Sequence, residues 1–508
     1  MSFLNTLISL YVKRRIEQIR YFKLHAYEAQ NKVLQKLIAS AKNTEWGRSF
    51  DYQHIKNYKD FTERVAIQDY ESLKPYIDRL RQGKQNILWN TRIEWFAKSS
   101  GTTADRSKFI PLSHESLHEC HFKAGKDMLS MYMHRYPQTL LFRGKSLVMG
   151  GSQTLHQVNH HQIIEGDLSA ILMQNLPSWA AKRRTPELEV ALMKNWEEKI
   201  EKMAQITSKE NITSMIGVPS WTLVLLKRIL EVTNKQHIAE VWPKLEVFFH
   251  GGVSFRPYRQ QFEKLIPLQH LRYVETYNAS EGFFGIQDDP LDESMLLMLD
   301  YGIFYEFVPL DQLNKANMCA LPLWETEVGK NYAMLISTNS GLWRYMLGDT
   351  IIFTSQNPYK FRISGRTRHF INAFGEEVIA ENAEKAFEIA CNKCNAQMRE
   401  YTGAPVYFSQ NRNGAHQWLL EFEKPPDDFE CFIDTFDKAL QSVNSDYEAK
   451  RFHDMVLSRP IMQQVPQGTF YLWMKSRNKL GGQNKVPRLA NERNYIEEIL
   501  TLLEKSHA

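Results

Sequence analysis

The residues best suited to chemistry form one short stretch, Lys98 to Lys108, which reads Lys-Ser-Ser-Gly-Thr-Thr-Ala-Asp-Arg-Ser-Lys. Its members from Ser99 to Thr103 are small or hydroxylated, so they suit no hydrophobic core. Hydroxyl and backbone N–H groups can instead close around an anion, while Lys108 supplies compensating charge. The stretch therefore predicts a phosphate-binding loop. It is not a Walker loop, because no Gly-Lys-Ser/Thr follows Gly101 at the required spacing, and taken alone it is equally typical of an ordinary turn.

Further polar segments stand beside strand-like runs. They are His250-Gly251-Gly252 after the run 247–249, Tyr277 to Gly282 after the run 271–276, Ser340 to Asp349 before the run 350–353, and Gly365-Arg366 before a helix beginning near Glu376. Glycines at a strand end let a ligand approach the backbone, and carboxylates such as Glu281 and Asp349 can hold a metal ion or accept hydrogen bonds. Each segment taken singly is also typical of a solvated turn.

The elements that must position these segments begin with helices. Residues 5–42 carry apolar side chains at spacings of three and four, which predicts one or two long helices that end by Gly47. Residues 68–80 predict a helix that stops near Gly83. Residues 86–89 predict a strand that leads into the hydroxyl-rich loop.

Strands and helices then alternate. Strand-like runs punctuated by glycines between residues 140 and 171 precede a polar helix over 185–206, and the strand at 247–249 follows. This alternation predicts an α/β fold with mixed, largely parallel β-sheets flanked by helices. From Glu376 onward the pattern is α+β: helices over 377–393 and 429–443, strands near 406–408, 417–422 and 455–457, and an apolar run over 469–473.

Length and composition exclude several classes of protein. With 508 residues, 43% of them hydrophobic, the chain is long enough for two or three cores, because single cores stop growing near about 250–300 residues. The net charge is only +5, and basic residues alternate with acidic ones, which argues against a nucleic-acid partner. The N-terminus lacks the order of a secretory signal, no apolar run could span a membrane, and five scattered cysteines suit a reducing compartment. We expect a cytoplasmic protein.

Two short motifs could suggest a metal. Ser113 is a good N-cap for a helix carrying His114-Glu115-Ser116-Leu117-His118, the zinc-protease pattern, but the chain offers no third ligand at the required spacing. Cys391 and Cys394 have zinc or redox spacing but lie in a helix-like stretch without a second pair. Solvated histidines and ordinary thiols are the better interpretation of both.

The order of the polar segments along the chain is far more specific than any one of them. A hydroxyl-rich loop, a Gly-Gly strand end, Tyr-x-x-Ser-Glu-Gly, Tyr-x-x-Gly-Asp and Gly-Arg together resemble the adenylating superfamily of firefly luciferase, the acyl-CoA synthetases and peptide-synthetase adenylation domains. Within it, the segment Tyr70 to Arg79, the doubled Ser99-Ser100, Arg344-Tyr345 and Gly482 to Arg488 resemble the Gretchen Hagen family, the auxin-responsive acyl acid amido synthetases. The resemblance spans roughly residues 70–488.

The resemblance implies a two-domain ligase. An N-terminal adenylation domain over 1–365 would bind ATP and the acyl group, and a small α+β lid over 366–508 would rotate about Thr367-Arg368 between two half-reactions. The enzyme would use ATP and Mg²⁺ to convert a carboxylic acid into an acyl-adenylate, and then transfer the acyl group to the amine of an amino acid. The implied partners are these small substrates, with no nucleic acid and no membrane span. The oligomeric state is open, and a monomer is favoured.

The resemblance also implies a role for each candidate residue. Ser99, Ser100, Gly101, Thr102 and Thr103 would hold the β- and γ-phosphates with Lys108, and Glu281 would hold Mg²⁺ with help from Ser280. Asp349 would accept hydrogen bonds from both ribose hydroxyls, while Gly251, Gly252 and Tyr277 would line the adenine and acyl pocket. Arg366 would lie at the domain junction near ribose or phosphate. Lys485 would bridge the attacking carboxylate and the α-phosphate, and removing such a group commonly lowers a rate by roughly 10²–10³.

Two departures from the family pattern and two rival functions accompany this expectation. Ala104-Asp105 stands where glycine is usual, which places a carboxylate near the expected phosphates, and Met346 replaces a usual arginine. The first rival is an acyl-CoA ligase or another thioester-forming enzyme on the same fold. The second is a nucleotide-binding descendant without turnover, which the joint presence of Glu281, Asp349 and Lys485 argues against.

Overall fold

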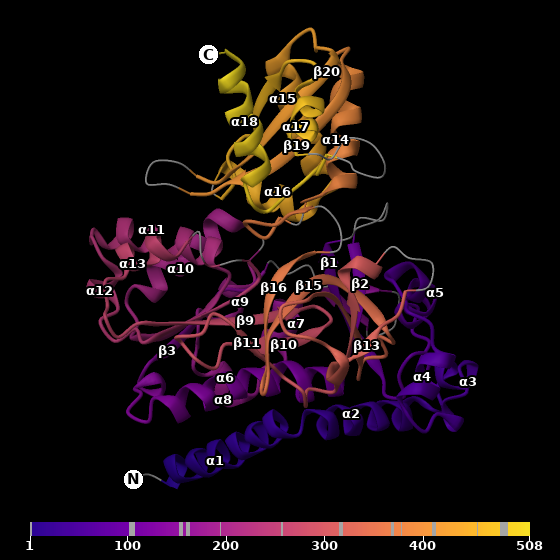
Figure 1. The fold of residues 1–508 in the computed structure, drawn as a ribbon. Helices are drawn as coiled ribbons and strands as arrows, with labels where there is room; N and C mark the ends of the chain where they lie inside the picture. The colour runs from indigo at the N-terminus through magenta and orange to yellow at the C-terminus, as the bar shows by residue number, and fades with distance from the viewer. Residues whose placement is uncertain are drawn as a thin grey trace.

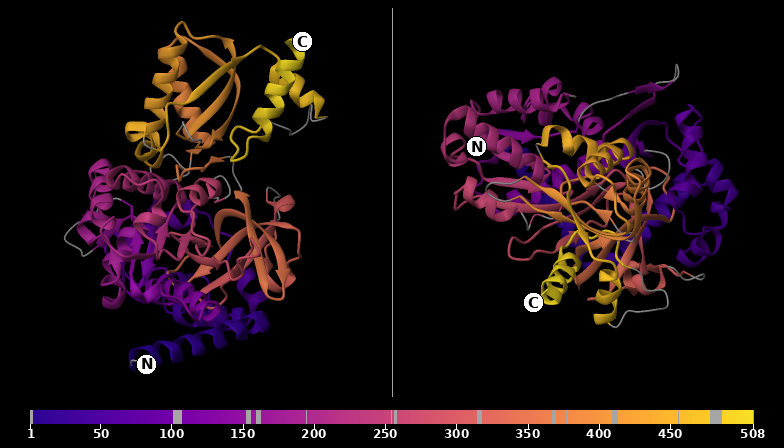
Figure 2. Two further views of the ribbon diagram at one scale, coloured as in Figure 1. Left: turned by 90° about the vertical axis from the view of Figure 1, so that its left-hand side faces the viewer. Right: turned by 90° about the horizontal axis from the view of Figure 1, so that it is seen from above.

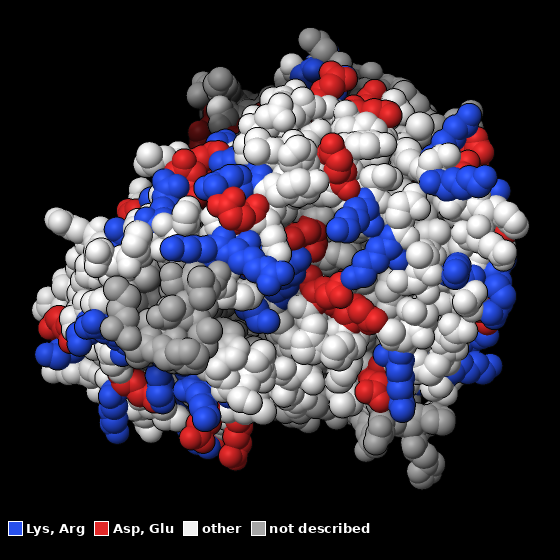
Figure 3. All heavy atoms as spheres, turned by 90° about the horizontal axis from the view of Figure 1, so that it is seen from below, with Lys and Arg blue, Asp and Glu red and all other residues white. Residues whose placement is uncertain are grey.

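Two lobes of unequal size make up the chain in this computed structural model, with the C-terminal lobe above the larger N-terminal one and the N-terminal helices along the opposite side (Figure 1). The structure describes residues 3–100, 107–151, 156–158, 163–193, 195–253, 255, 258–313, 318–366, 370–376, 378–408, 413–454, 456–477 and 486–507. No helix within these ranges is both long and apolar enough to cross a membrane. On the face seen from below, Lys and Arg side chains alternate with Asp and Glu side chains (Figure 3).

The helices of the N-terminal lobe begin with the expected long pair. They are α1 (Phe3–Leu24), α2 (Ala26–Ala41), α3 (Glu45–Ser49), α4 (Tyr58–Arg64), α5 (Tyr70–Arg81), α6 (Phe122–Arg135), α7 (Leu168–Gln174), α8 (Ser178–Ala181), α9 (Leu188–Ala191), α10 (Trp196–Thr207), α11 (Pro219–Thr233), α12 (Ile238–Val241) and α13 (Arg259–Leu265). Arg15 fastens α1 through bidentate hydrogen bonds to Asp127 on α6, at 2.8 and 2.7 Å. Gly47 does not end the helical region as expected. It lies inside α3, and glycine is required there because a Cβ would stand 2.1 Å from the Ala41 carbonyl oxygen.

A 12-stranded mixed sheet forms the centre of the N-terminal lobe. Its order is β13-β12-β14-β15-β16-β11-β10-β9-β8-β7-β3-β6. The strands are β3 (Lys145–Val148), β6 (Arg184–Thr185), β7 (Ile212–Gly217), β8 (Val247–His250), β9 (Arg272–Ala279), β10 (Gly282–Ile286), β11 (Met295–Leu297), β12 (Ile303–Pro309), β13 (Leu321–Pro322), β14 (Asn331–Thr338), β15 (Tyr345–Gln356) and β16 (Tyr359–Arg366).

Only one half of this sheet is parallel. The strands β6, β3, β7, β8 and β9 run the same way, so their carboxyl ends meet at one edge, where a ligand typically binds in such sheets. The pairs from β9 to β13 are antiparallel and bring β15 and β16 beside the same edge. The mixed α/β architecture predicted from the sequence is confirmed.

A second sheet carries the hydroxyl-rich loop. Its order is β2-β1-β5-β4, formed by β1 (Ile93–Ser100), β2 (Ser107–Ser113), β4 (His156–Val158) and β5 (Ile163–Gly166). β1 and β2 form an antiparallel hairpin in which Ser99 is opposite Lys108 and Ser100 is opposite Ser107. The two ends of the loop are therefore fixed by backbone pairing.

Two predicted elements of the N-terminal lobe are wrong. Residues 86–89 form no strand. The side chains of residues 87–89 are buried in the core, and the carbonyls of Asn86 and Ile87 accept hydrogen bonds from the N–H groups that begin α3. The predicted helix over 185–206 is interrupted, because Asn195 caps a new helix, α10, by accepting a hydrogen bond from the Glu198 N–H at 3.0 Å.

The C-terminal lobe is a three-stranded sheet between helices. β19 (Gln397–Val406), β20 (Ala415–Lys424) and β21 (Ile461–Val465) form the sheet, after a short hairpin of β17 (Phe370–Ile371) and β18 (Val378–Ile379). The helices are α14 (Ala380–Lys393), α15 (Phe429–Val443), α16 (Ser445–Arg451), α17 (Thr469–Ser476) and α18 (Asn494–His507). Along β20, Trp418 and Leu420 pack toward α14 and α15, whereas Leu419 packs toward α17 and α18. The predicted strand at 455–457 is absent from its described residues; Leu457 makes one isolated bridge, to Gly414.

The two lobes touch through the segment that joins them. The Tyr258 hydroxyl donates a hydrogen bond to the Ala373 carbonyl at 2.5 Å, and Ser220 on α11 donates one to the Phe374 carbonyl at 3.2 Å. The Tyr258 and Phe408 rings are 5.9 Å apart. Two further views show the C-terminal lobe seated over the edge of the large sheet (Figure 2).

Candidate active site

The segment Tyr345 to Asp349 begins β15, and the turn of the predicted segment Ser340 to Asp349 lies just before it, where the Gly341 N–H donates to the Thr338 carbonyl at 3.0 Å. Asp349 is opposite Arg366 on β16, and the backbone of Gln68 pairs with β15 through the Met346 N–H at 2.8 Å. The pairing draws the start of α5 to the strand that carries Asp349. The segment is therefore held on both sides before any ligand binds.

Arg344, directly before this segment, maintains the fold. Its backbone has a φ of 44°, and its side chain is buried against Glu306, with Nη2 to Oε1 at 2.9 Å. It also donates to the Val65 carbonyl at 2.6 Å, and Tyr58 donates to Glu306 at 2.9 Å. A buried ion pair of this kind is satisfied internally, so Arg344 is not available to a ligand.

A cavity of about 1310 Å³ brings together candidate residues that are far apart in the sequence. Those lining it are Ser99 and Lys108 of the hairpin, Gly252 after β8, Tyr277 on β9, Ser280 and Glu281 in the β9–β10 turn, and Asp349 on β15. Glu281 and Asp349 are each only 9% exposed. These two carboxylates are nearly buried and lie at the sheet edge where ligands typically bind, so they are candidate ligand-binding groups.

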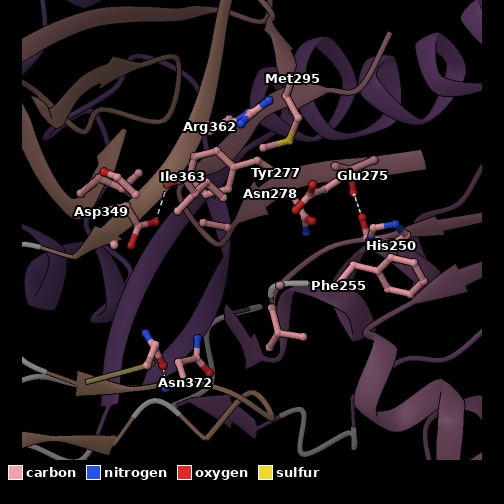
Figure 4. Close-up of a pocket in the computed structure, with 18 of the residues that line it drawn as sticks. His250, Phe255, Glu275, Tyr277, Asn278, Met295, Asp349, Arg362, Ile363 and Asn372 are labelled. Atoms are coloured by element: carbon pink, nitrogen blue, oxygen red, sulfur yellow. Dashed lines mark hydrogen bonds between the residues drawn. The ribbon is translucent and has the colours of Figure 1, made fainter. Parts of the chain in front are cut away.

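Tyr277 and Asp349 are joined directly. The tyrosine hydroxyl donates a hydrogen bond to Oδ2 of Asp349 across the cavity wall (Figure 4). Both side chains are nearly buried, at 6% and 9% exposure. The bond orients the carboxylate, because Oδ2 must face the tyrosine.

The acidic groups of the cavity gather near one buried phenol. Burial raises the pKa of Tyr345 well above its ordinary value, and the nearby carboxylates of Glu281, Asp69 and Asp349 raise it further, as does the Tyr70 hydroxyl. The carboxylates of Glu281, Asp69 and Asp349, all of which line the cavity, are therefore close to one another. Within the described ranges no three His, Cys, Asp or Glu side chains are grouped to hold a metal. A magnesium ion held by one carboxylate and phosphate oxygens needs no such group, so Glu281 fits that role.

The beginning of α5 also belongs to the cavity, although the sequence did not predict it as part of the site. Asp69, Tyr70 and Glu71 line the cavity, and the Tyr70 hydroxyl accepts a hydrogen bond from the Phe109 N–H at 2.8 Å, which anchors the strand after the loop. A signal was present in the sequence, because Asp69 and Ser72 form a capping box that fixes where the helix begins.

Some expected site residues cannot be placed at the cavity. Gly101, Thr102, Thr103 and Lys485 lie outside the described residues, and Ser100 and Arg366 are described by their backbone alone. Gly251 lines a neighbouring cavity, and its missing Cβ is required by packing, since a Cβ would lie 2.4 Å from the Thr276 carbonyl oxygen.

The neighbouring cavity is larger than a single aromatic ring requires and is mostly apolar. It has a volume of about 1130 Å³ and shares Ser99, Gly252, Thr276 and Ser280 with the first cavity. Its apolar lining includes Phe122, Met128, Leu129, Phe142, Val148, Met149, Leu172, Met173, Ile216 and Phe249. A ligand in one cavity can therefore present a group to a ligand in the other.

Two buried histidines near these cavities predict an acid-sensitive fold. Burial lowers the pKa of His250 to about 3 and that of His121 to about 4, from an ordinary value of 6.5. Protons bind the unfolded chain more readily, so stability falls as the pH drops below 6.5 and the loss continues toward the folded pKa values. From about pH 7.5 to about pH 5.5, each histidine is expected to lower the free energy of unfolding by about 1–1.5 kcal/mol.

Denaturant unfolding of His250→Gln at both pH values measures this contribution. The variant should lose part of the pH dependence, whereas His54→Gln, at an exposed histidine bonded to Asp51, should keep it. An unchanged pH dependence in His250→Gln would contradict the assignment.

Nearly the whole chain matches the domains of one protein family. Residues 15–271, 296–366 and 381–494 match the GH3 family N-terminal, central and C-terminal domains, respectively. The chain is 23% identical to indole-3-acetic acid-amido synthetase GH3.4 of Arabidopsis thaliana, covering 94% of this chain and 90% of that one. It is 21% identical to the 4-substituted benzoates-glutamate ligase GH3.12 of Arabidopsis thaliana, covering 93% and 94%.

Two solved structures share the fold. One is the AtGH3.15 acyl acid amido synthetase in complex with 2,4-DB, with a TM-score of 0.63, 17% identity and 96% of both chains covered. The other is 2-hydroxyisobutyryl-CoA ligase in complex with 2-HIB-AMP and CoA, with a TM-score of 0.57, 14% identity and coverage of 94% of this chain and 92% of that one.

Proposed function

The chain belongs to the GH3 family, as its motifs predicted, and from this premise we propose that it is an ATP-dependent acyl acid amido synthetase. Its relatives are named amido synthetases and ligases, and its fold is that of an acyl acid amido synthetase. The reaction is the ligation of a carboxylic acid to an amino acid. The cytoplasmic location and monomeric state expected from the sequence stay predictions.

The chemistry requires two steps. A carboxylate oxygen attacks the α-phosphorus of ATP, the bond to the bridging oxygen breaks, and pyrophosphate leaves. The amine of an amino acid then attacks the acyl carbon, AMP leaves with the electron pair, and the amine loses a proton. Activation is needed because a free carboxylate has no leaving group better than oxide.

One observation carries the proposal: Ser99, Lys108, Glu281 and Asp349, from four separate segments, line a single cavity that opens into an apolar one. The first cavity suits a nucleotide, because a cation, hydroxyls and carboxylates all line it. The second suits the body of an organic acid. The shared rim, which includes Ser99 and Gly252, is where the carboxylate and the α-phosphate would meet.

The roles that we assign to this chain follow from that arrangement. Glu281 would hold Mg²⁺ beside the phosphates, Asp349 would bind the ribose hydroxyls, and Lys108 with the loop 99–103 would bind the outer phosphates. Lys485 would neutralise charge at the reacting phosphorus, and residues 366–508 would move as a lid between the steps. Magnesium, when bound, would supply charge neutralisation at the pyrophosphate leaving group.

Exchange of labelled pyrophosphate into ATP, measured with a panel of carboxylic acids, tests the proposal. We expect exchange that depends on the acid, and amide formation when amino acids are added. Thioester formation with CoA in place of an amide would support the acyl-CoA ligase instead. ATP binding by folded protein with no exchange for any acid would support the descendant without turnover.

A further inference from the structure

The deep end of the apolar cavity is polar. Arg184 on β6, Ser146 on β3 and Ser214 on β7 are neighbours across the parallel strands, in one rung of the sheet. Two residues further along, Val148, Ile216 and Phe249 form the next rung on the same face. Two residues further again, the segments that follow these three strands reach Gly150, Val218 and Gly251. These residues lie at the rim that borders the nucleotide cavity.

The cavity therefore has a defined length and polarity. From the rung of Ser146 to the rim at Gly150 is four residues, or roughly 13 Å at about 3.3 Å per residue of strand. The middle is apolar, and α6 and α7 cover it with Met128, Leu129, Leu172 and Met173. A substrate that spans this cavity meets apolar groups along its body and polar groups only at its two ends.

The polar end is positively charged. Arg183 and Arg184 both line the cavity. Within the described residues neither is within ion-pair distance of a carboxylate, although Glu187 is near enough to Arg184 to interact with it electrostatically. Arg184 Nη1 donates to the Pro186 carbonyl at 2.6 Å, while its Nε is buried with no hydrogen-bond partner among the described residues. The Arg183 guanidinium lies over the Phe142 ring, 5.0 Å from its centre. Burial lowers the pKa of both side chains, and for Arg184 the nearby carboxylate of Glu187 opposes this shift without reversing it.

The serines beside Arg184 add a donor. Ser214 donates its hydroxyl proton to Ser146 at 2.8 Å, which leaves the Ser146 proton to be donated onward. The acidic residues of the same cavity do not balance this end: Asp167 lies beside Gly151 at the rim, and Asp446 and Glu448 belong to α16 of the other lobe.

We propose that the acid substrate has two charged ends: one carboxylate at the rim, where it is activated, and a second carboxylate held by Arg184 and Ser146. Its body is an apolar chain or ring system lying over Val148, Ile216 and Phe249. The inference rests on the proposed function, because it assumes that this cavity receives the acid. Arginine and a hydroxyl donor match a carboxylate, and the separation of the two ends selects the length of the acid.

The test compares α,ω-dicarboxylic acids with monocarboxylic acids of equal length in pyrophosphate exchange. We expect the wild type to prefer the dicarboxylic acid of fitting length by at least about tenfold in kcat/KM. Only that acid can form a charge-assisted hydrogen bond with Arg184, whereas the monocarboxylic acid places an apolar end against the guanidinium. Arg184→Met should remove the preference, lowering kcat/KM for the dicarboxylic acid by about 10- to 100-fold and leaving the monocarboxylic acid unchanged or improved. Arg184→Lys should restore part of it.

Gly125→Leu is the matched control. Gly125 lines the cavity from α6, and a Cβ there meets no atom within 4 Å, so a side chain added at this position starts in open space. This variant should disfavour long acids of both kinds alike. Should Arg184→Met unfold, Arg184→Lys and Ser146→Ala give the same comparison.

Equal kcat/KM values for both kinds of acid in the wild type, or equal losses in Arg184→Met, would overturn the inference while leaving the proposed function intact. If no acid supports exchange, the proposed function fails, and calorimetric binding of the free acids decides the inference separately. A dicarboxylic acid that binds the wild type at least about tenfold more tightly than Arg184→Met supports it, and equal binding rejects it.

Discussion

Replacing Glu281 by glutamine is expected to lower acid-dependent pyrophosphate exchange by roughly 10²–10³, because the change removes the charge that would hold Mg²⁺ at the leaving pyrophosphate. Glu281 lies at the β9–β10 turn, lines the nucleotide cavity and is only 9% exposed. Glutamine keeps the shape and one acceptor oxygen, so the fold should be retained. Exchange rates measured over a range of Mg²⁺ concentrations check this, and the variant should need more Mg²⁺ than the wild type.

Asp289→Asn provides the control for Glu281→Gln. Asp289 is another carboxylate close in sequence, but it is exposed and pairs with Arg135 at 2.9 Å. Its neutralisation should leave the exchange rate and its Mg²⁺ dependence unchanged. If Glu281→Gln melts at the wild-type temperature and exchanges pyrophosphate at the wild-type rate, Glu281 has no part in the reaction.

Replacing Asp349 by alanine is expected to lower kcat/KM for ATP by roughly 10²–10³, because two hydrogen bonds from ribose hydroxyls to a carboxylate are lost together. The strand positions of Asp349 and Tyr277 and the hydrogen bond between them hold the carboxylate at the cavity wall. Most of the loss should appear in KM, since the ribose is bound equally before and during the reaction. The measurement is pyrophosphate exchange against ATP concentration.

Tyr277→Phe separates the orientation of the Asp349 carboxylate from its charge. The variant keeps the Asp349 carboxylate but removes the hydroxyl that orients it, so we expect a smaller loss, of about 3- to 10-fold. A loss in Tyr277→Phe as large as that in Asp349→Ala would mean that the tyrosine itself contacts the nucleotide. Wild-type KM for ATP in Asp349→Ala would remove the ribose assignment altogether.

The sequence alone was sufficient for the family, the mixed α/β fold and the reaction class. It was sufficient because the informative segments are local: a hydroxyl-rich loop, a Gly-Gly strand end and the acidic residues Glu281 and Asp349 each keep a recognisable spacing to their neighbours. Long helices such as α15, with its regular apolar spacing, were also predicted with their observed ends.

Local patterns failed where a tertiary contact overrode them. Residues 86–89 look like a strand, but the side chains of residues 87–89 fill a core, and Gly47 looks like a helix end but is required by the nearby Ala41 carbonyl. Arg344 belongs to a segment that marks the family, and the sequence does not show that its guanidinium is paired with Glu306, which lies 38 residues away in the chain. Such partners are set by how the strands are ordered in the sheet, which no local spacing records.

What the sequence by itself determined is therefore the set of chemical groups and the order in which the chain presents them. Only the tertiary structure decided that Tyr277 bonds to Asp349, that Tyr70 anchors the strand after the loop, and that Arg184 and Ser146 share the deep end of a cavity. The physical reason is that a binding site depends on distances across strands, and these follow from sheet order and register. The identity of each residue fixes what it can bind, and the fold fixes what it can reach.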